Sequence, residues 1–339
     1  MRTISWDNGT ITTIDQTLLP AEYREIECKT VHTLCEAIIS LRIRGAPALG
    51  AAGGYGVALA AHTGTAGTLS EFMHDLEIEA DQIRRTRPTA INLTWGIDRM
   101  IAAVRRASSI DEARRIALFE ATAIADEDVE RNTQLSRHGA ALLDDGDTVL
   151  THCNAGRLAC VDVGTALGVI RAAVEEGKKL SVISCETRPL NQGSRLTVWE
   201  LMQDSIPVTL IPDSAAGMMM RKGKIDKVIV GADRITRDAV FNKIGTYTHS
   251  VLAKEHKVPF YVAAPISTFD LTGLERYVTI EERDPGELRR INDVMLAPAD
   301  AAVYNPAFDA TPVENVAAVI TEDGVVYPAE SESWNDLFS

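Results

Sequence analysis

DTVLTH, at positions 147–152, is the first of five short apolar runs that decide the fold. The others are KLSVISCE (179–186), IPVTLI (206–211), DKVIVGAD (226–233) and VPFYVAA (258–264). Each of the first four is followed by Gly, Asn, Ser or Asp and then by a segment of helical periodicity. Continuous β-branched runs that alternate with helices are typical of a parallel sheet covered on both faces. This half of the chain is therefore predicted to be a Rossmann-like α/β domain.

The part of the chain before residue 145 has a different pattern. Residues 1–15 predict a β-hairpin, because the strand TISW leads into Asp7-Asn8-Gly9, a type I′ turn signal, and then into the alternating TITTI. Helical patterns follow at 31–42, 47–62, 69–86, 92–107 and 110–140. The predicted fold class is α/β, with residues 1–125 as a mainly helical N-terminal domain and residues 126–339 as the parallel-sheet domain.

Composition and charge narrow the classes of partner. The chain has 339 residues and a formal net charge of −14, and residues 270–339 hold 15 acidic side chains and four arginines. Such a surface repels nucleic acid and anionic membranes, so neither is an expected partner. The longest uncharged run, Gly45–Ala61, is rich in Gly and Ala and shorter than the ~20 apolar residues of a spanning helix. It predicts a helix packed closely against a neighbour.

The cysteines and the first residues indicate a compartment. The start, MRTISWDNGT, is polar and does not resemble a secretory leader. The five cysteines are an odd number, and we expect them to be reduced thiols in the cytoplasm. Cys153 and Cys160 lack C-x-x-C spacing, so a metal site is not expected.

Polar residues gather where the predicted strands end. Ligands bind outside the carboxyl ends of the strands of an open parallel sheet. These ends are residues 152–156, 185–189, 213–214 and 231–234. Cys153 stands before a predicted helix, whose N-terminus would favour a thiolate, and the alternative is a small core residue. His152 is expected to point to the opposite face, which argues against a Cys–His pair.

Asp233 follows VIVGA, a strand predicted to be buried. Partial desolvation raises the pKa of a carboxyl group and suits it to donate a proton near neutral pH. The alternatives are an N-cap for a following helix and an ion-pair partner for Arg234.

Several further residues are candidates for binding a phosphorylated sugar. Arg44 precedes Gly45 and Ala46, whose backbone N–H groups can approach an anion at a helix start, and Arg87 has a similar context. The simpler interpretation of either arginine is a solvated surface charge. Gln192, Asn242 and Lys243 lie in polar segments after predicted strands, and turn chemistry or exposure would also explain them. No G-x-G-x-x-G follows a strand, so a dinucleotide site is not indicated.

The motifs together resemble the methylthioribose-1-phosphate isomerase family, which is homologous to the regulatory subunits of translation initiation factor 2B. The resemblance rests on IRGAPALGAAGGYGVALA (43–60), RPTAINLTWGIDRM (87–100), THCNAGRLA (151–159), ETRPLNQGSRLTVWELMQDSIPVTLI (186–211), GKIDKVIVGADRI (223–235) and NKIGTYTHSVLAKEHKVPFYVAAPISTFD (242–270). It extends from about residue 1 to residue 328. Departures from the family pattern at Arg157, Cys185 and Met218 leave the preference for the 5-substituent open.

The resemblance implies an aldose–ketose isomerase that converts 5-methylthioribose 1-phosphate to the ketose 1-phosphate, in methionine salvage, with 5-deoxyribose 1-phosphate as a second substrate. It implies Asp233 as general acid and Cys153 at the reacting carbons, by proton or by hydride transfer. Substrate binding is implied for Arg44, Gly45, Ala46, Arg87, Gln192, Asn242 and Lys243. No cofactor or metal is implied, and a homodimer is expected. The alternatives are a ribose-1,5-bisphosphate isomerase and a non-catalytic regulatory subunit of the initiation-factor 2B type.

Overall fold

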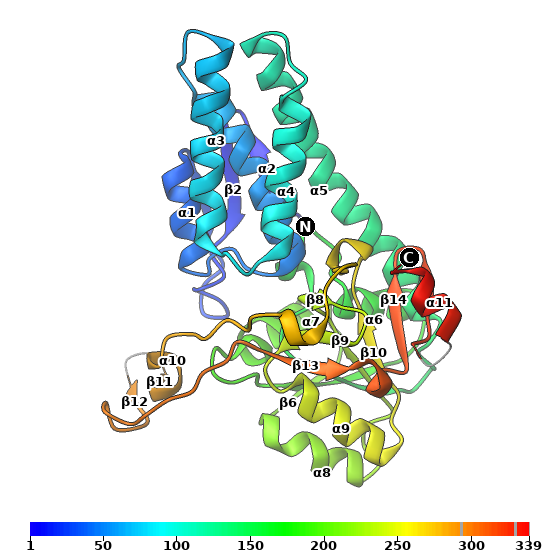
Figure 1. Ribbon diagram of the computed structural model, residues 1–339. Coiled ribbons are helices and arrows are strands. Elements are labelled where there is room, and N and C mark those ends of the chain that lie inside the picture. Colours follow the sequence, from blue (N-terminus) through cyan, green and yellow to red (C-terminus); the bar gives the residue numbers. More distant parts are fainter. Residues whose placement is uncertain (292–293, 329–330, 339) are drawn as a thin grey trace. The chain divides into compact units, whose positions relative to one another are not determined.

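The computed structural model describes residues 1–291, 294–328 and 331–338, which form two compact units (Figure 1). The first unit comprises Met1–Thr133 and Gly156–Gly164, and the second comprises Gln134–Ala155 and Thr165–Ser339. The units divide after Thr133, inside the long helix α5 (Ile110–Ala140). The sequence-based boundary after residue 125 lies in the same helix and stays a prediction, and it did not include the return of residues 156–164 to the first unit.

The first unit combines a small antiparallel sheet with helices. Its strands are β1 (Ile4–Asp7), β2 (Thr10–Ile14) and β3 (Glu25–Cys28), and its helices are α1 (Val31–Ile39), α2 (Ala46–Thr63), α3 (Leu69–Thr86), α4 (Ile91–Val104) and the first part of α5. Asn8 and Gly9 both have positive φ, as the predicted hairpin turn requires. Strand β3 pairs with β2 and was not predicted.

Helix α2 is the centre of this unit. All its residues from Ala48 to Ala61 are buried, as its Gly- and Ala-rich sequence predicted. Small side chains let helices α2 and α4 come very close. A Cβ atom added to Gly96 in α4 would lie 2.3 Å from the carbonyl oxygen of Gly50 in α2. Backbone atoms in a buried helix cannot move aside cheaply, so this contact requires glycine.

Replacing Gly96 with alanine should therefore destabilise the first unit. Overpacking of this kind typically lowers the free energy of unfolding by about 1–3 kcal/mol, even though alanine favours a helix. The matched control is Gly67→Ala, since a Cβ added there meets nothing within 4 Å. Urea denaturation followed by circular dichroism should show a lower midpoint for Gly96→Ala alone. Equal midpoints for the two variants would refute the close-packing argument.

The segment 156–164 is tied into the first unit by backbone groups and one buried acid. The Thr3 N–H donates to the Val161 carbonyl at 2.8 Å, and the Val161 N–H donates to Asp128 Oδ2 at 2.7 Å. Asn132 Nδ2 also donates to Asp128, at 3.0 Å. Burial outweighs these hydrogen bonds and raises the pKa of Asp128 to about 7.

This raised pKa makes a signed pH prediction for Asp128→Asn. The folded state holds the Asp128 proton up to a higher pH than the unfolded state, so wild-type stability falls, relative to the variant, as pH rises from about 4 to about 7. The difference in free energy of unfolding should change by up to about 4 kcal/mol across this window. The amide of the variant can be accommodated, because Asn132 Oδ1 is buried and has no hydrogen-bond partner among the described residues.

Urea denaturation of both proteins at several pH values measures that difference. Asp111→Asn, at an exposed position of the same helix, controls for the loss of one charge. A stability difference between wild type and Asp128→Asn that stays constant from pH 4 to pH 8 would contradict the prediction.

The second unit is built on the predicted parallel sheet. Its strands, in spatial order, are β15 (Gly324–Val326), β14 (Ala318–Thr321), β10 (Phe260–Ala263), β7 (Lys227–Val230), β4 (Thr148–Thr151), β5 (Ser181–Cys185) and β6 (Val208–Ile211). All neighbouring pairs are parallel except β14–β15. Alternate residues feed two cores, with Leu150 and Val228 in one and Val149 and Ile229 in the other.

The α/β fold class and its parallel sheet are confirmed. One detail of the prediction was wrong, since β6 is not covered on both faces. It is the last strand of the sheet, and both Thr209 and Leu210 are exposed, Leu210 to 48 %.

Further elements complete the second unit (Figure 1). The helices are α6 (Ala166–Glu175), α7 (Val198–Gln203), α8 (Ala216–Arg221), α9 (Thr246–His256), α10 (Gly286–Arg289) and α11 (Ser331–Asp336). A small sheet is formed by β8 (Arg234–Ile235), β9 (Ala239–Lys243) and β13 (Phe308–Pro312), and a two-stranded ribbon by β11 (Arg290–Ile291) and β12 (Val294–Met295).

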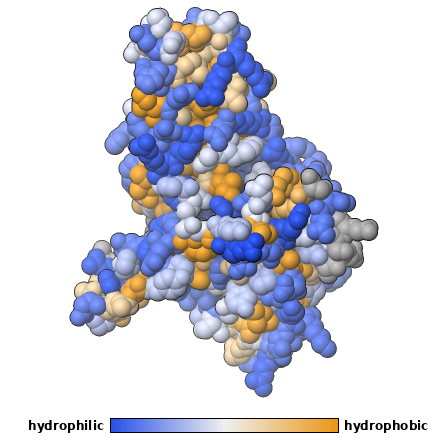
Figure 2. All heavy atoms as spheres, viewed as in Figure 1, coloured by the Kyte–Doolittle hydropathy of each residue, from blue (hydrophilic) through white to orange (hydrophobic). Residues whose placement is uncertain are grey.

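The surface of the ribbon is partly apolar. Exposed side chains there include Ile291, Val294, Met295 and Leu296, and Figure 2 shows apolar atoms on this projecting part. Among the helices that the structure describes, none combines the length and apolar character that a membrane span requires.

Candidate active site

Loops that carry the candidate residues lie at the carboxyl ends of four adjacent strands. In the order β7, β4, β5, β6 these strands are followed by Asp233, Cys153, Thr187 and Asp213. The Cys153 N–H donates to Thr187 Oγ1 at 2.9 Å, and the Thr187 N–H donates to Asp213 Oδ1 at 2.7 Å. The loops after β4, β5 and β6 are thus joined by direct hydrogen bonds.

Cys153 has an unusual backbone conformation. Its φ is +65°, in the left-handed region, and its partner Thr187 has φ +66°. Such a conformation costs non-glycine residues about 1–3 kcal/mol each and persists only where the surroundings hold it. The Cys153 carbonyl also accepts from Thr197 Oγ1 at 2.6 Å. Both backbone polar groups of this half-buried residue are therefore held by threonine hydroxyl groups.

The helix expected directly after Cys153 is not present. A three-residue 3-10 turn, Arg157–Ala159, follows instead, and α6 begins only at Ala166. The prediction that a helix N-terminus favours the Cys153 thiolate was wrong, because the chain leaves the sheet at this point before it forms α6.

The neighbouring His152 is engaged elsewhere. It is fully buried, its Nε2 lies 2.8 Å from the Ile244 carbonyl oxygen, and its Nδ1 lies 3.2 Å from Nε2 of His249. Burial lowers the pKa of His152 to about 4, so the imidazole is neutral at physiological pH. These contacts agree with the expectation that His152 and Cys153 do not form a catalytic pair.

Asp233 is half buried between β7 and β8, and its N–H donates to the Phe241 carbonyl at 2.8 Å. A strand follows it rather than a helix, so it is not an N-cap. The neighbouring Arg234 pairs with Asp270 at 3.6 Å. Of the interpretations weighed for Asp233, the helix cap is thus removed by the structure.

Three further candidates lie in the second unit. Gln192 is buried, and its Oε1 has no hydrogen-bond partner among the described residues, which leaves this oxygen able to accept from a ligand hydroxyl. Asn242 Nδ2 donates to Thr246 Oγ1 at 3.0 Å. Lys243 is buried, with its Nζ 2.8 Å from the Ala307 carbonyl oxygen and 4.8 Å from the centre of the Phe308 ring.

The remaining candidates lie in the first unit. Helix α2 begins at Ala46 after Gly45, whose φ of +93° and contact with Ala159 leave no room for a Cβ atom. Arg44 Nε donates to Gln16 Oε1 at 3.0 Å. Arg87 is the C-cap of α3 and precedes α4, as expected. Helix α2 therefore begins directly after Gly45, and Pro47 lies in its first turn.

Comparison with known proteins identifies the family of this chain. The model of the initiation factor 2 subunit family matches residues 42–328. The chain belongs to the initiation factor 2 subunit family. The similar proteins carry two kinds of name, that of an isomerase and that of a translation initiation factor.

A protein of Heliobacterium modesticaldum named methylthioribose-1-phosphate isomerase is 50% identical over 339 residues, covering 98% of this chain and 98% of its own. The crystal structure of 5-methylthioribose 1-phosphate isomerase from Pyrococcus horikoshii OT3 has 42% identity and a TM-score of 0.92, covering 99% of this chain and 95% of that one. A crystal structure titled translation initiation factor eIF-2B, subunit delta, from A. fulgidus has 57% identity and a TM-score of 0.89, covering 99% of both chains.

A buried polar network beside Cys153 was missed by sequence reasoning. Asn154 Nδ2 donates to Thr197 Oγ1 at 3.2 Å and to Glu200 Oε1 at 2.9 Å. Arg171 pairs with Glu200 at 2.7 Å and with Asp204 at 2.5 Å. The signal in the sequence was a charged residue inside each of two apolar helical segments, GVIRAAV and VWELM. In this family member the network supports the segment that presents Cys153.

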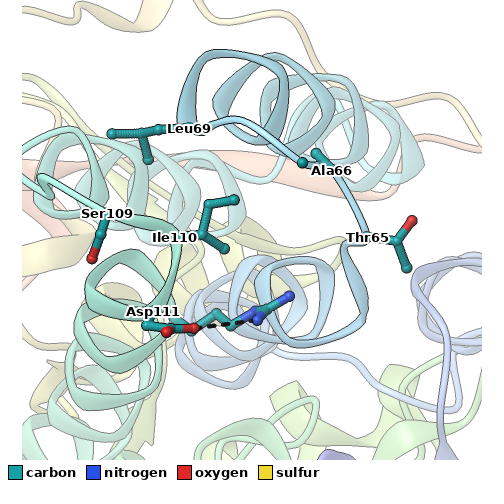
Figure 3. A pocket seen from close by; sticks show the side chains of 8 residues that line it. Thr65, Ala66, Leu69, Ser109, Ile110 and Asp111 are labelled. Carbon is teal, nitrogen blue, oxygen red and sulfur yellow. Dashed lines mark ion pairs between the residues drawn. The ribbon is translucent and has the colours of Figure 1, made fainter.

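A surface pocket of about 430 Å³ lies in the first unit, between the segment that follows α2 and the start of α5 (Figure 3). Arg114 and Asp111 on its wall form an ion pair at 3.6 Å. Its lining residues include none of the candidate site residues. This pocket is therefore not part of the candidate active site.

Proposed function

We propose that this family member is an aldose–ketose isomerase that converts 5-methylthioribose 1-phosphate to 5-methylthioribulose 1-phosphate in the cytoplasm. The observation that carries the proposal is the strained, doubly held Cys153 at the end of β4, with Asp233 after the adjacent strand β7. A binding scaffold has no need to hold a thiol in a strained left-handed conformation. The names of the relatives at 42–50% identity support the same activity.

The reaction follows from the chemistry of the substrate. The phosphate ester locks the anomeric carbon of the furanose, so the ring cannot open to a free aldehyde without help. We assign Asp233 to protonate the ring oxygen as the ring opens. Cys153 assists the transfer of hydrogen from C2 to C1. The C2 hydroxyl loses its proton to solvent, so that C2 is oxidised to a ketone and C1 is reduced. The conversion is redox-neutral within the substrate and consumes no external oxidant.

Substrate binding is assigned to residues beside helix starts and to residues that follow strands. We propose that Arg44, Gly45 and Ala46, with Arg87, bind the phosphate and the sugar. The helix start supplies backbone N–H groups, and arginine forms paired hydrogen bonds with phosphate. Gln192, Asn242 and Lys243 complete the set. The buried Gln192 Oε1, which has no hydrogen-bond partner in the described part of the chain, supports a contact with a sugar hydroxyl.

We also propose a homodimer formed through the second unit. Exposed large apolar side chains on this unit support it: Met202, Leu210, Met218, Tyr247 and Val251. Isolated exposed apolar residues are ordinary, but several on neighbouring elements mark a protein contact. Sedimentation equilibrium tests the stoichiometry.

A substrate panel tests the proposed activity. Purified protein is incubated with the 1-phosphates of 5-methylthioribose, 5-deoxyribose and ribose 5-phosphate, and ketose 1-phosphate formation is followed by NMR. We expect turnover of the first two substrates. Turnover of the bisphosphate alone would identify a ribose-1,5-bisphosphate isomerase. No turnover of any would reject the enzyme in favour of a regulatory subunit, the alternative raised by the initiation-factor relative at 57% identity.

The same experiment in deuterium oxide distinguishes the two routes of hydrogen transfer. Deuterium at C1 of the product indicates proton transfer through groups that exchange with solvent. Hydride transfer is indicated when the hydrogen that was on C2 of the substrate is found, without exchange, on C1 of the product.

A further inference from the structure

Three side chains that bind metals well meet inside the second unit. His152 follows β4, Cys185 ends β5, and His249 lies in the first turns of α9. One ligand atom from each lies within 4.8 Å of those of the other two. All three residues are buried, with exposed fractions of 0–1%. The activity proposed above assigns no role to this His–Cys–His cluster.

The two imidazole rings are placed as neighbouring ligands would be. His249 Nε2 and His152 Nδ1 are 3.2 Å apart. Two nitrogen ligands on a tetrahedral Zn²⁺, at about 2.0–2.1 Å from the metal, are separated by roughly 3.3–3.4 Å. A small movement of the rings would therefore admit a metal ion in place of the present N···N contact.

The surroundings orient these ligands in the way metal sites require. His152 Nε2 is 2.8 Å from the Ile244 carbonyl oxygen, which accepts its proton and leaves Nδ1 as the lone-pair nitrogen facing His249. Such a hydrogen bond on the far nitrogen is the usual support of a metal-binding histidine. The Nδ1 atom of His249 is buried and has no hydrogen-bond partner among the described residues.

Charge balance adds a fourth group. Asp213 Oδ1 lies 3.8 Å from His152 Nδ1. The Asp213 carboxylate is held in place by the N–H groups of Thr187 and Arg188, at 2.7 and 2.8 Å. A divalent cation beside one thiolate and one carboxylate leaves no net charge buried, which removes the main penalty of an interior ion.

We propose that His152, Cys185 and His249 bind one Zn²⁺ ion, with Asp213 as the fourth ligand. Nitrogen and sulfur ligands fit zinc and exclude the hard cations Mg²⁺ and Ca²⁺. On binding, the Cys185 S–H bond breaks, a zinc–thiolate bond forms and the proton passes to solvent. The ion has a structural role, since it joins the ends of β4 and β5 to α9. One of its ligands, His152, directly precedes Cys153.

The test measures metal directly and does not depend on isomerase activity. The full chain is stripped with a chelator under reducing conditions, titrated with Zn²⁺ and freed of unbound metal. Elemental analysis should then find about one zinc per chain, as a closed four-ligand site requires. Replacement by Co²⁺ should give the intense visible bands of tetrahedral cobalt and a thiolate-to-cobalt charge-transfer band in the near ultraviolet.

Matched variants assign the metal to the cluster. Cys185→Ala and His249→Gln should lose the stoichiometric metal, and Cys185→Ala should lose the charge-transfer band. Cys28→Ala removes an equally buried thiol from the first unit and should keep both. Circular dichroism establishes that each variant is folded, and His249→Gln serves if Cys185→Ala is not.

Two outcomes would overturn the proposal. One is substoichiometric metal, or an octahedral cobalt spectrum without a thiolate band, in the folded wild-type protein. The other is a Cys185→Ala or His249→Gln variant with the same metal content as Cys28→Ala.

Zinc should also raise the melting temperature of wild type but not that of the two cluster variants.

Discussion

Replacing Cys153 with alanine, or Asp233 with asparagine, is expected to lower kcat/KM for 5-methylthioribose 1-phosphate by about 10²–10⁴-fold, the range that a positioned acid or base contributes. The loss should fall on kcat, because each side chain is assigned to the reacting atoms and not to uniform binding of the substrate. Stopped-time NMR assays at saturating substrate measure this effect.

The controls separate chemistry from folding. Cys35→Ala removes a half-buried thiol from α1, in the first unit, and should keep wild-type activity. Cys153→Ala relieves no backbone strain, since alanine also disfavours a φ of +65°, so circular dichroism and melting temperature must be compared. Wild-type kcat in a folded Cys153 or Asp233 variant would remove that residue from the mechanism.

Replacing Glu200 with alanine is expected to lower the free energy of unfolding by about 3–5 kcal/mol, the usual effect of breaking a buried ion pair. Glu200 and Arg171 are only 2% and 5% exposed, and their charged groups are 2.7 Å apart. Without Glu200, Asn154 Nδ2 loses its 2.9 Å acceptor, and Arg171 loses one of the two carboxylates that pair with it. Urea denaturation monitored by circular dichroism measures the loss.

Two comparisons make this second prediction specific. Glu200→Gln keeps an oxygen that accepts from Asn154 and should be less destabilising than Glu200→Ala. Glu22→Ala breaks the exposed pair with Arg24 and should change the free energy of unfolding by less than about 1 kcal/mol. The interpretation of the network would be wrong if Glu200→Ala and Glu22→Ala had similar effects.

Much of the fold could be predicted because it depends on local sequence patterns. The β-branched runs are strands, the periodic segments of the first unit are helices, and Asn8-Gly9 forms a turn with positive φ at both residues. The positions of Cys153 and Asp233 at strand ends followed from the same patterns, since a strand's end is visible where its apolar run stops.

Local patterns failed where a residue's environment depends on distant chain. The periodicity of VTLI does not reveal that β6 is the last strand, and so Leu210 was expected to be covered. Nothing near Cys153 indicates that residues 156–164 leave the sheet for the first unit, which removed the expected helix.

The sequence by itself determined the order of strands and helices along the chain, the α/β class, the family and the candidate residues, because hydrophobic period, turn residues and motif order are local properties. Only the tertiary structure decided which strands are neighbours, that Thr187 and Thr197 hold Cys153 in a left-handed conformation, and that His249 lies against His152, 97 positions earlier in the chain. These contacts arise from long-range packing, in which residues distant in sequence are brought together by the burial of whole elements.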